Sequence, residues 1–320
     1  MSIQPILAIN DLTVGFPTGT GEIQPVISSL HARVRPGEIV AIIGSSGSGK
    51  SLLAEALLGV SSRAAYVAGH LEYRGKKLDG RKLTALAGRE IGLIPQSVNS
   101  LDPLMKIGKQ ILGDGRCTRS EMLDFFDRYQ LPTNTADKYP FEISGGMARR
   151  VLIAAALLTK PEMIIADEPT PGLQTELAEL VMDDLREFVK GNKAALVITH
   201  DAELALKYAD RISVFYAGTT VEVGVVAHWQ DDMRSDGGPF HPYTRALLDS
   251  LPGREFAAYP GTQPLPGTYS GCPFAARCPG RISECGGEIP SVRIGEAMVR
   301  CANPAVYGAS KLHRREDARR

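Results

Sequence analysis

The segment that most constrains this chain is Gly44–Ser51, with the sequence GSSGSGKS. A flexible linker could use the same residues, so the flanking segments decide between the two interpretations. Residues 38–43 (EIVAII) form an apolar, β-branched run, and residues 52–58 (LLAEALL) carry leucines at helical spacing. The sequence therefore predicts a strand, a tight turn and a helix, in that order.

The predicted turn fits the pattern G-x-x-x-x-G-K-[ST], which indicates a phosphate loop when it follows a strand and opens a helix. Glycines let the backbone curve so that its N–H groups converge on phosphate oxygens, and the helix start adds a positive dipole. We expect Lys50 to contact the β- and γ-phosphates and the Ser51 hydroxyl to bind Mg²⁺. The alternative is a glycine- and serine-rich turn with an incidental lysine. The predicted phosphate loop consists of Gly44, Ser45, Ser46, Gly47, Ser48, Gly49, Lys50 and Ser51.

A second candidate element is the run MIIADE at residues 163–168, an apolar strand that ends in two carboxylates. Asp167 is placed to hold Mg²⁺ through water, and Glu168 to orient or deprotonate the water that attacks the γ-phosphate. Paired acids after a strand often form only a solvated turn. The phosphate loop in the same chain favours the catalytic interpretation, in which Glu168 makes the protein a hydrolase rather than a nucleotide binder.

Composition and charge exclude some partners. The 320 residues contain 36 basic and 36 acidic side chains, so the net charge of zero does not suggest a nucleic-acid partner. No apolar run approaches the length of a membrane span, and the start (MSIQPILAIND) lacks the basic and apolar regions of a signal peptide. We therefore expect a cytosolic chain whose membrane role, if any, depends on a partner.

The pattern along the chain predicts two units. Residues 1–235 alternate β-type runs with helical stretches, which indicates an α/β body with antiparallel strands near its start. Residues from about 97 to 160 are mostly helical in pattern, which predicts an inserted helical subdomain. Residues 236–320 are rich in glycine, proline and cysteine, which predicts an irregular extension that needs something other than a large apolar core.

The segment ISGGM, residues 143–147, resembles the signature motif of ABC ATPases, which usually has the sequence LSGGQ. Ser144, Gly145 and Gly146 keep a small hydroxyl and close backbone N–H groups at a helix start. In that family they bind the γ-phosphate held by the other ATPase subunit. The resemblance implies an α/β P-loop fold with a RecA-like mixed sheet core, an antiparallel β subdomain, an inserted helical subdomain and a small cysteine-containing extension.

Three further residues follow the order of the same family. Gln96 is similar to the glutamine that senses Mg²⁺ and couples the site to the membrane subunits, and His200 to the histidine that contacts the γ-phosphate. Phe16 matches the aromatic residue that stacks on adenine. A structural histidine and an ordinary core aromatic are the alternatives for the last two. Gln174 departs from the family, because an acid that bridges the dimer usually stands there, so one composite site could be weakened.

The segments HPYTRALL (241–248) and GCPFAARCPG (271–280) resemble the C-terminal extension of ATPases from oligopeptide, dipeptide and nickel importers. This resemblance implies an ATP-hydrolysing subunit that powers import of peptides or nickel and metal chelates. It also implies two transmembrane permease subunits, a second ATPase subunit, an indirect link to an external binding protein, and a peripheral position on the cytoplasmic face of the inner membrane. A soluble ABC ATPase and a regulatory nucleotide-binding subunit with little hydrolysis remain alternatives.

Four of the five cysteines lie in the extension, at positions Cys272, Cys278, Cys285 and Cys301. The cytosol disfavours disulfides, and the spacing misses the short pairs of structural zinc sites. In relatives with this extension the four thiolates can hold a [4Fe-4S] cluster. The cluster, zinc and reduced thiols all remain open from the sequence.

Overall fold

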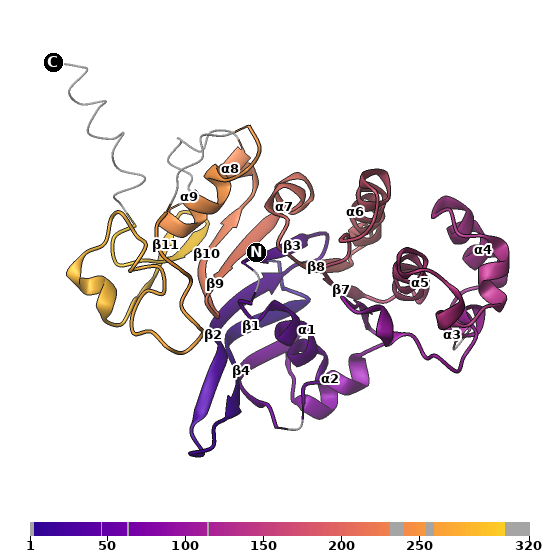
Figure 1. Ribbon diagram of the computed structural model, residues 1–320, viewed down its shortest axis with the longest axis horizontal. Helices are drawn as coiled ribbons and strands as arrows, with labels where there is room; N and C mark the ends of the chain where they lie inside the picture. The colour runs from indigo at the N-terminus through magenta and orange to yellow at the C-terminus, as the bar shows by residue number, and fades with distance from the viewer. Residues whose placement is uncertain are drawn as a thin grey trace.

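The structure is a computed structural model that describes residues 3–45, 47–62, 64–113, 115–230, 240–253 and 259–304. A long mixed sheet crosses the molecule, with helices on both of its faces (Figure 1). The helices are α1 (Lys50–Leu58), α2 (Gly80–Leu86), α3 (Ile107–Leu112), α4 (Arg119–Arg128), α5 (Gly145–Leu158), α6 (Thr175–Val189), α7 (Ala202–Tyr208), α8 (Ala227–Gln230) and α9 (Pro242–Asp249). Short 3₁₀ turns are η1 (Val98–Ser100), η2 (Thr133–Asp137), η3 (Pro140–Glu142) and η4 (Ser283–Gly286).

The sheet runs in the order β5-β4-β1-β2-β10-β9-β3-β8-β7-β6, with β12 paired to β10 and β11 to β12. The pairs β9–β3, β3–β8, β8–β7 and β7–β6 are parallel. The pairs β1–β2, β1–β4 and β4–β5 are antiparallel. The strands are β1 (Leu7–Pro17), β2 (Ile23–Val34), β3 (Ile39–Gly44), β4 (Tyr66–Tyr73), β5 (Lys76–Lys77), β6 (Ile91–Ile94), β7 (Met163–Asp167), β8 (Ala194–Thr199), β9 (Arg211–Tyr216), β10 (Thr219–Val225), β11 (Ser291–Ile294) and β12 (Ala297–Arg300).

The parallel strands are buried on both faces, which explains their continuous apolar runs. Along β3, Ile39, Ala41 and Ile43 belong to the core that includes α5, α6 and α7. Val40 and Ile42 alternate with them and belong to the opposite core, which includes α1 and α2. Because successive strand residues point to opposite faces, one short strand holds both layers of helices in place.

The segment from about 97 to 160 contains η1, α3, α4, η2, η3 and α5, and no strand among its described residues. It lies at one end of the molecule in Figure 1, beyond the last parallel strand. Helix α4 begins with a complete capping box, in which Thr118 and Glu121 satisfy each other's backbone amides. The subdomain boundaries themselves, and the division at residue 235, remain predictions.

The described part of the C-terminal extension contains α9, η4 and the short strands β11 and β12. Strand β12 pairs antiparallel with β10 at Glu222 and Val223, so the extension adds strands to the central sheet. Tyr243 and Phe274 belong to the same apolar core as α5–α7. The composition did not indicate this because the extension contributes scattered apolar side chains to an existing core and builds no large core of its own.

Glu222 joins the extension to the sheet and gives the fold a pH-dependent contact. Its side chain is fully buried, and its two carboxylate oxygens accept the backbone N–H groups of Phe240 and His241, both at 2.9 Å. Burial raises the pKa of Glu222 to about 7, against the opposing effect of these hydrogen bonds. Below about pH 7 the protonated form of the Glu222 carboxyl group is therefore favoured in the folded state.

We expect Glu222 to contribute less stability as pH rises. An acid with a raised folded pKa stabilises the native state fully below its unfolded pKa, and this contribution is lost as pH rises through the folded value. The free energy of unfolding of wild type relative to Glu222→Gln should therefore fall between about pH 4.5 and 7 and level off above. Denaturant unfolding from pH 5 to 8 measures this, with exposed Glu296→Gln as control; a flat difference would contradict the assignment.

Candidate nucleotide site

The phosphate loop connects β3 to α1 as the sequence predicted. Gly47 and Gly49 have φ angles of 76° and 97°, which suit glycine and strain other residues. At Gly44, an added Cβ would lie 2.2 Å from the carbonyl oxygen of Phe215, so a side chain would push the loop away from β9. Gly49 caps α1 without any side-chain bond, which leaves the first N–H groups of the helix directed at the loop. Ser46 lies outside the described residues.

Lys50 is buried beneath the loop. Its ammonium group donates to the carbonyl oxygens of Gly44, at 2.8 Å, and Ser45, at 3.0 Å. Burial lowers the pKa of Lys50, and the charges of Glu168 and Asp167 oppose this effect. The two predicted acids therefore act on the predicted phosphate-binding cation, although they lie more than a hundred positions away in the sequence.

The three predicted Mg²⁺ ligands converge beside the loop. The Ser51 hydroxyl donates to Oε1 of Gln96 at 2.9 Å, and its hydrogen bonding to Asp167 opposes the rise in pKa that burial causes in that carboxyl group. One carboxylate oxygen of Asp167, Oδ1, is buried without a hydrogen-bond partner. A hydroxyl, an amide oxygen and an unsatisfied carboxylate are the hard oxygen ligands that Mg²⁺ prefers, so these residues fit the ion.

Glu168 and His200 form the predicted catalytic pair. Nδ1 of His200 lies 2.8 Å from Oε1 of Glu168, and the Thr199 hydroxyl donates to Oε2 of the same carboxylate at 3.2 Å. Glu168 is buried and has a φ of 47°, a left-handed conformation that is costly for a residue with a side chain. Its backbone N–H donates to the carbonyl of Ile198 on the neighbouring strand, which holds this conformation in place.

Arg149 is a site residue that the sequence analysis missed. It projects from α5, is buried, and donates through Nη1 to the backbone carbonyls of Pro95 and Glu168, at 3.0 and 3.1 Å. Burial lowers its pKa, and the charges of Asp167 and Glu168 oppose this. Arg149 thus joins the helix after the signature segment to the segment that precedes Gln96. The only sequence signal for Arg149 was its position two residues after ISGGM.

The signature segment leads into α5 at the surface of the chain. Ser144 caps α5 by accepting the backbone N–H of Met147, and both Ser144 and Gly145 are exposed. A Cβ on Gly145 or Gly146 would meet no atom within 4 Å. The chain itself therefore does not require glycine here, and the open surface leaves room for another molecule.

Strand β2 links Phe16 of β1 to the phosphate loop, because β2 has contacts with both. Phe16 is half-buried in β1 and pairs with Gln24 of β2. Val26 and Ile27, further along β2, lie 3.2 Å from the position of a Cβ on Gly49. The contact of Phe16 with adenine stays a prediction.

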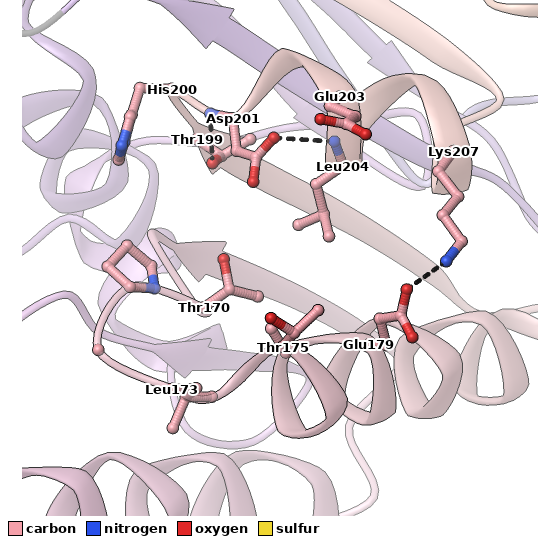
Figure 2. A pocket seen from close by; sticks show the side chains of 13 residues that line it. Thr170, Leu173, Thr175, Glu179, Thr199, His200, Asp201, Glu203, Leu204 and Lys207 are labelled. Carbon is pink, nitrogen blue, oxygen red and sulfur yellow. Dashed lines mark hydrogen bonds and ion pairs between the residues drawn. The ribbon is translucent and has the colours of Figure 1, made fainter. Parts of the chain in front are cut away.

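A pocket of about 430 Å³ opens beside His200. Figure 2 shows His200 at one end, Thr170 and Leu173 on the opposite wall, and the Lys207–Glu179 ion pair at the other end. Asp201 caps α7 by accepting the N–H of Leu204, which fixes the segment that carries His200. The pocket is thus lined by the segments that follow Glu168 and His200.

Gln174 is the N-cap residue of α6, and its side chain makes no capping hydrogen bond. Aspartate accepts such a bond well, so Gln174→Asp should raise the free energy of unfolding by about 1 kcal/mol relative to Gln174→Ala. Denaturant titration without nucleotide measures the change, and equal stability of the two variants would contradict it.

The four cysteines of the extension lie within electrostatic range of one another. Burial raises the pKa of Cys272 to about 11, and the charges of Cys301, Cys285 and Cys278 add to this rise. Nevertheless, within the described ranges no three His, Cys, Asp or Glu side chains are arranged to hold a metal ion. The thiols as placed do not fit a cluster or a zinc site.

Taken together, the phosphate loop, the predicted Mg²⁺ ligands and the Glu168–His200 pair at the ends of parallel strands define a P-loop nucleoside triphosphatase. Residues 27–171 match the family described as "ABC transporter", and residues 237–285 match "Oligopeptide/dipeptide transporter, C-terminal region".

Comparisons with individual proteins agree with these matches. The chain is 34% identical to the oligopeptide transport ATP-binding protein OppD of Salmonella typhimurium, over 93% of this chain and 94% of that protein. It is 31% identical to the dipeptide transport ATP-binding protein DppD of Bacillus subtilis, over 93% and 95%. The dimeric bacterial ABC transporter cassette MJ0796 aligns with a TM-score of 0.60 and 27% identity, over 69% of this chain and 98% of that one.

The chain therefore belongs to the family of ABC transporter ATP-binding subunits, and it is an ATP-hydrolysing enzyme. The fold class predicted from the sequence is confirmed. Among the residues that the structure places, no helix has both the length and the apolar character to cross a membrane.

Proposed function

We propose that this chain is the ATPase subunit of an importer of peptides, with nickel or metal chelates as the alternative cargo. The observation that carries the proposal is the hydrogen-bonded pair of buried Glu168 and exposed His200, with the charge of Glu168 acting on the lysine of the phosphate loop. Relatives named as oligopeptide and dipeptide transport ATP-binding proteins support peptides as the cargo. The nickel or metal-chelate cargo rests on the resemblance of the C-terminal extension alone.

In the proposed reaction, Glu168 takes a proton from a water molecule as its oxygen attacks the γ-phosphorus, and the bond to the bridging oxygen of ADP breaks. Thr199 and His200 hold the carboxylate through hydrogen bonds to its two oxygens. Lys50 contacts the β- and γ-phosphates and offsets the charge that develops on them. Mg²⁺ bound by Ser51, Gln96 and Asp167 would neutralise further phosphate charge.

The exposed signature segment supports a head-to-tail pair of ATPase subunits. We propose that Ser144, Gly145 and Gly146 bind the γ-phosphate held by a second, homologous ATPase, while that subunit completes this chain's site. Closure of the pair would move the helical segment and the Gln96 loop against two permease subunits, at the cytoplasmic face of the inner membrane. A binding protein outside the membrane would contribute only through the permeases, and no nucleic acid takes part.

ATPase assays with and without co-purified permease subunits test this function. Hydrolysis that rises when the permeases are present, and rises again with a peptide-loaded binding protein, is the expected result. Equal hydrolysis in all conditions would favour a soluble ABC ATPase. Nucleotide binding with little hydrolysis in any condition would favour a regulatory subunit, for which Gln174 is the supporting residue.

The [4Fe-4S] cluster implied by the resemblance is kept as a proposal for Cys272, Cys278, Cys285 and Cys301. Its formation would require the thiols to move from their present places and to lose their protons, which burial opposes at Cys272, Cys278 and Cys301 by raising the pKa of each thiol. Iron analysis and visible absorption of anaerobically purified protein decide the matter. Colourless, iron-free protein would leave zinc, detectable by metal analysis, or reduced thiols.

A further inference from the structure

The C-terminal extension touches the phosphate loop at Ser45. The Ser45 hydroxyl donates to Oε1 of Gln263, a residue 218 positions later in the sequence. The backbone N–H of Ser45 also donates to the Tyr243 hydroxyl, and this bond opposes the rise in the pKa of Tyr243 that burial causes. One residue of the loop is thus held by two side chains of the extension.

Tyr243 is itself firmly held. It is buried, and its ring centroid lies 4.2 Å from that of Tyr216 and 5.5 Å from that of Phe274. The hydroxyl of Tyr216 accepts a hydrogen bond from Arg277 at 3.1 Å. Because aromatic packing and hydrogen bonds fix these rings, Tyr243 gives Ser45 a rigid support.

Ser45 lies at a point in the phosphate loop where contacts that hold it in place should affect phosphate binding. The backbone carbonyl of Ser45 accepts a hydrogen bond from Lys50. Ser45 follows Gly44, where an added Cβ would lie 2.2 Å from the carbonyl oxygen of Phe215. Ser45 therefore links the buried end of β3 to the curved, exposed part of the loop. A loop fixed at this point keeps its N–H groups in place and loses less freedom when a phosphate binds.

We propose that Tyr243 and Gln263 are positioning residues of the nucleotide site, so that the C-terminal extension preorganises the phosphate loop for ATP. The inference rests on the proposed nucleotide site and extends it to residues outside the ATPase motifs. Neither residue touches the reacting atoms. Both residues act through their contacts with Ser45, and this dependence on Ser45 distinguishes the proposal from a role in stability alone.

The test compares the full-length variants Tyr243→Phe and Gln263→Ala with wild type by calorimetric titration of MgATP. Loss of one such hydrogen bond should weaken binding by about 3- to 10-fold. With the permease complex, KM for ATP should rise by the same factor while kcat changes less than about twofold. Tyr269→Phe is the matched control, because its hydroxyl donates to the carbonyl of Ala217 in the turn between β9 and β10 rather than to the phosphate loop.

The decisive measurement repeats both substitutions in a Ser45→Ala background. If Gln263 acts through the Ser45 hydroxyl, Gln263→Ala should not weaken ATP binding further there, whereas Tyr243→Phe should weaken it as before, because the backbone amide of residue 45 remains. Unchanged ATP affinity in the single variants, or an equal loss from Gln263→Ala in both backgrounds, would overturn the inference. If Tyr243→Phe does not fold, the partly exposed Gln263 carries the same test. Wild type that binds no ATP would instead overturn the proposed function.

Discussion

Glu168→Gln should retain ATP binding and lose ATP hydrolysis by about 10²- to 10⁴-fold, the usual contribution of a general base. Glutamine has nearly the same shape and can still accept the Thr199 hydrogen bond at one position, but it cannot take a proton from water. Because the reaction then stops before the β–γ bond breaks, ATP-bound dimers should accumulate. Steady-state phosphate release and size-exclusion chromatography with MgATP measure the two effects.

The matched control for this substitution is Glu187→Gln. Glu187 is exposed on α6 and pairs with Lys190, so its loss removes the same charge away from the site. Its turnover should equal that of wild type. Normal turnover in Glu168→Gln would show that another group accepts the proton, and loss of ATP binding in that variant would show that the substitution disturbs the site as a whole.

The proximity of the predicted site residues could be expected from the sequence because each lies in a continuous motif, at the end of a strand or shortly after one. Asp167 ends β7 and Gln96 follows β6, which are parallel neighbours, so the carboxyl ends of these strands bring both residues to one edge of the sheet. His200 follows β8 in the same way. Motif order and parallel pairing together place the side chains without knowledge of any particular contact.

The supporting contacts were not predictable in this way. Arg149 donates to a carbonyl 19 positions away, and Ser45 to an amide 218 positions away, and neither separation has a helical or strand period. The left-handed backbone at Glu168 also has no sequence signal, because the residue type does not favour it. Packing of the whole chain decides these features, so they emerge only in the folded structure.

Lys50→Ala should reduce MgATP affinity by about 10²-fold or more, because two charge-assisted contacts to phosphate oxygens are lost together. The substitution also removes the ammonium group that bonds the carbonyls of Gly44 and Ser45, so the loop loses an internal support. Binding of ADP should fall less than that of ATP, since ADP lacks the γ-phosphate. Titration calorimetry with each nucleotide measures both losses.

Lys190→Ala, which removes an exposed, ion-paired lysine from α6, is the control for the loss of positive charge and should bind ATP as wild type does. Thermal unfolding separates a local effect from a global one. Wild type should gain stability with MgATP through mass action, whereas Lys50→Ala should unfold near the wild-type temperature without nucleotide and gain little when it is added. An equal gain in both proteins would mean that Lys50 does not hold the triphosphate, and the assigned site would then be wrong.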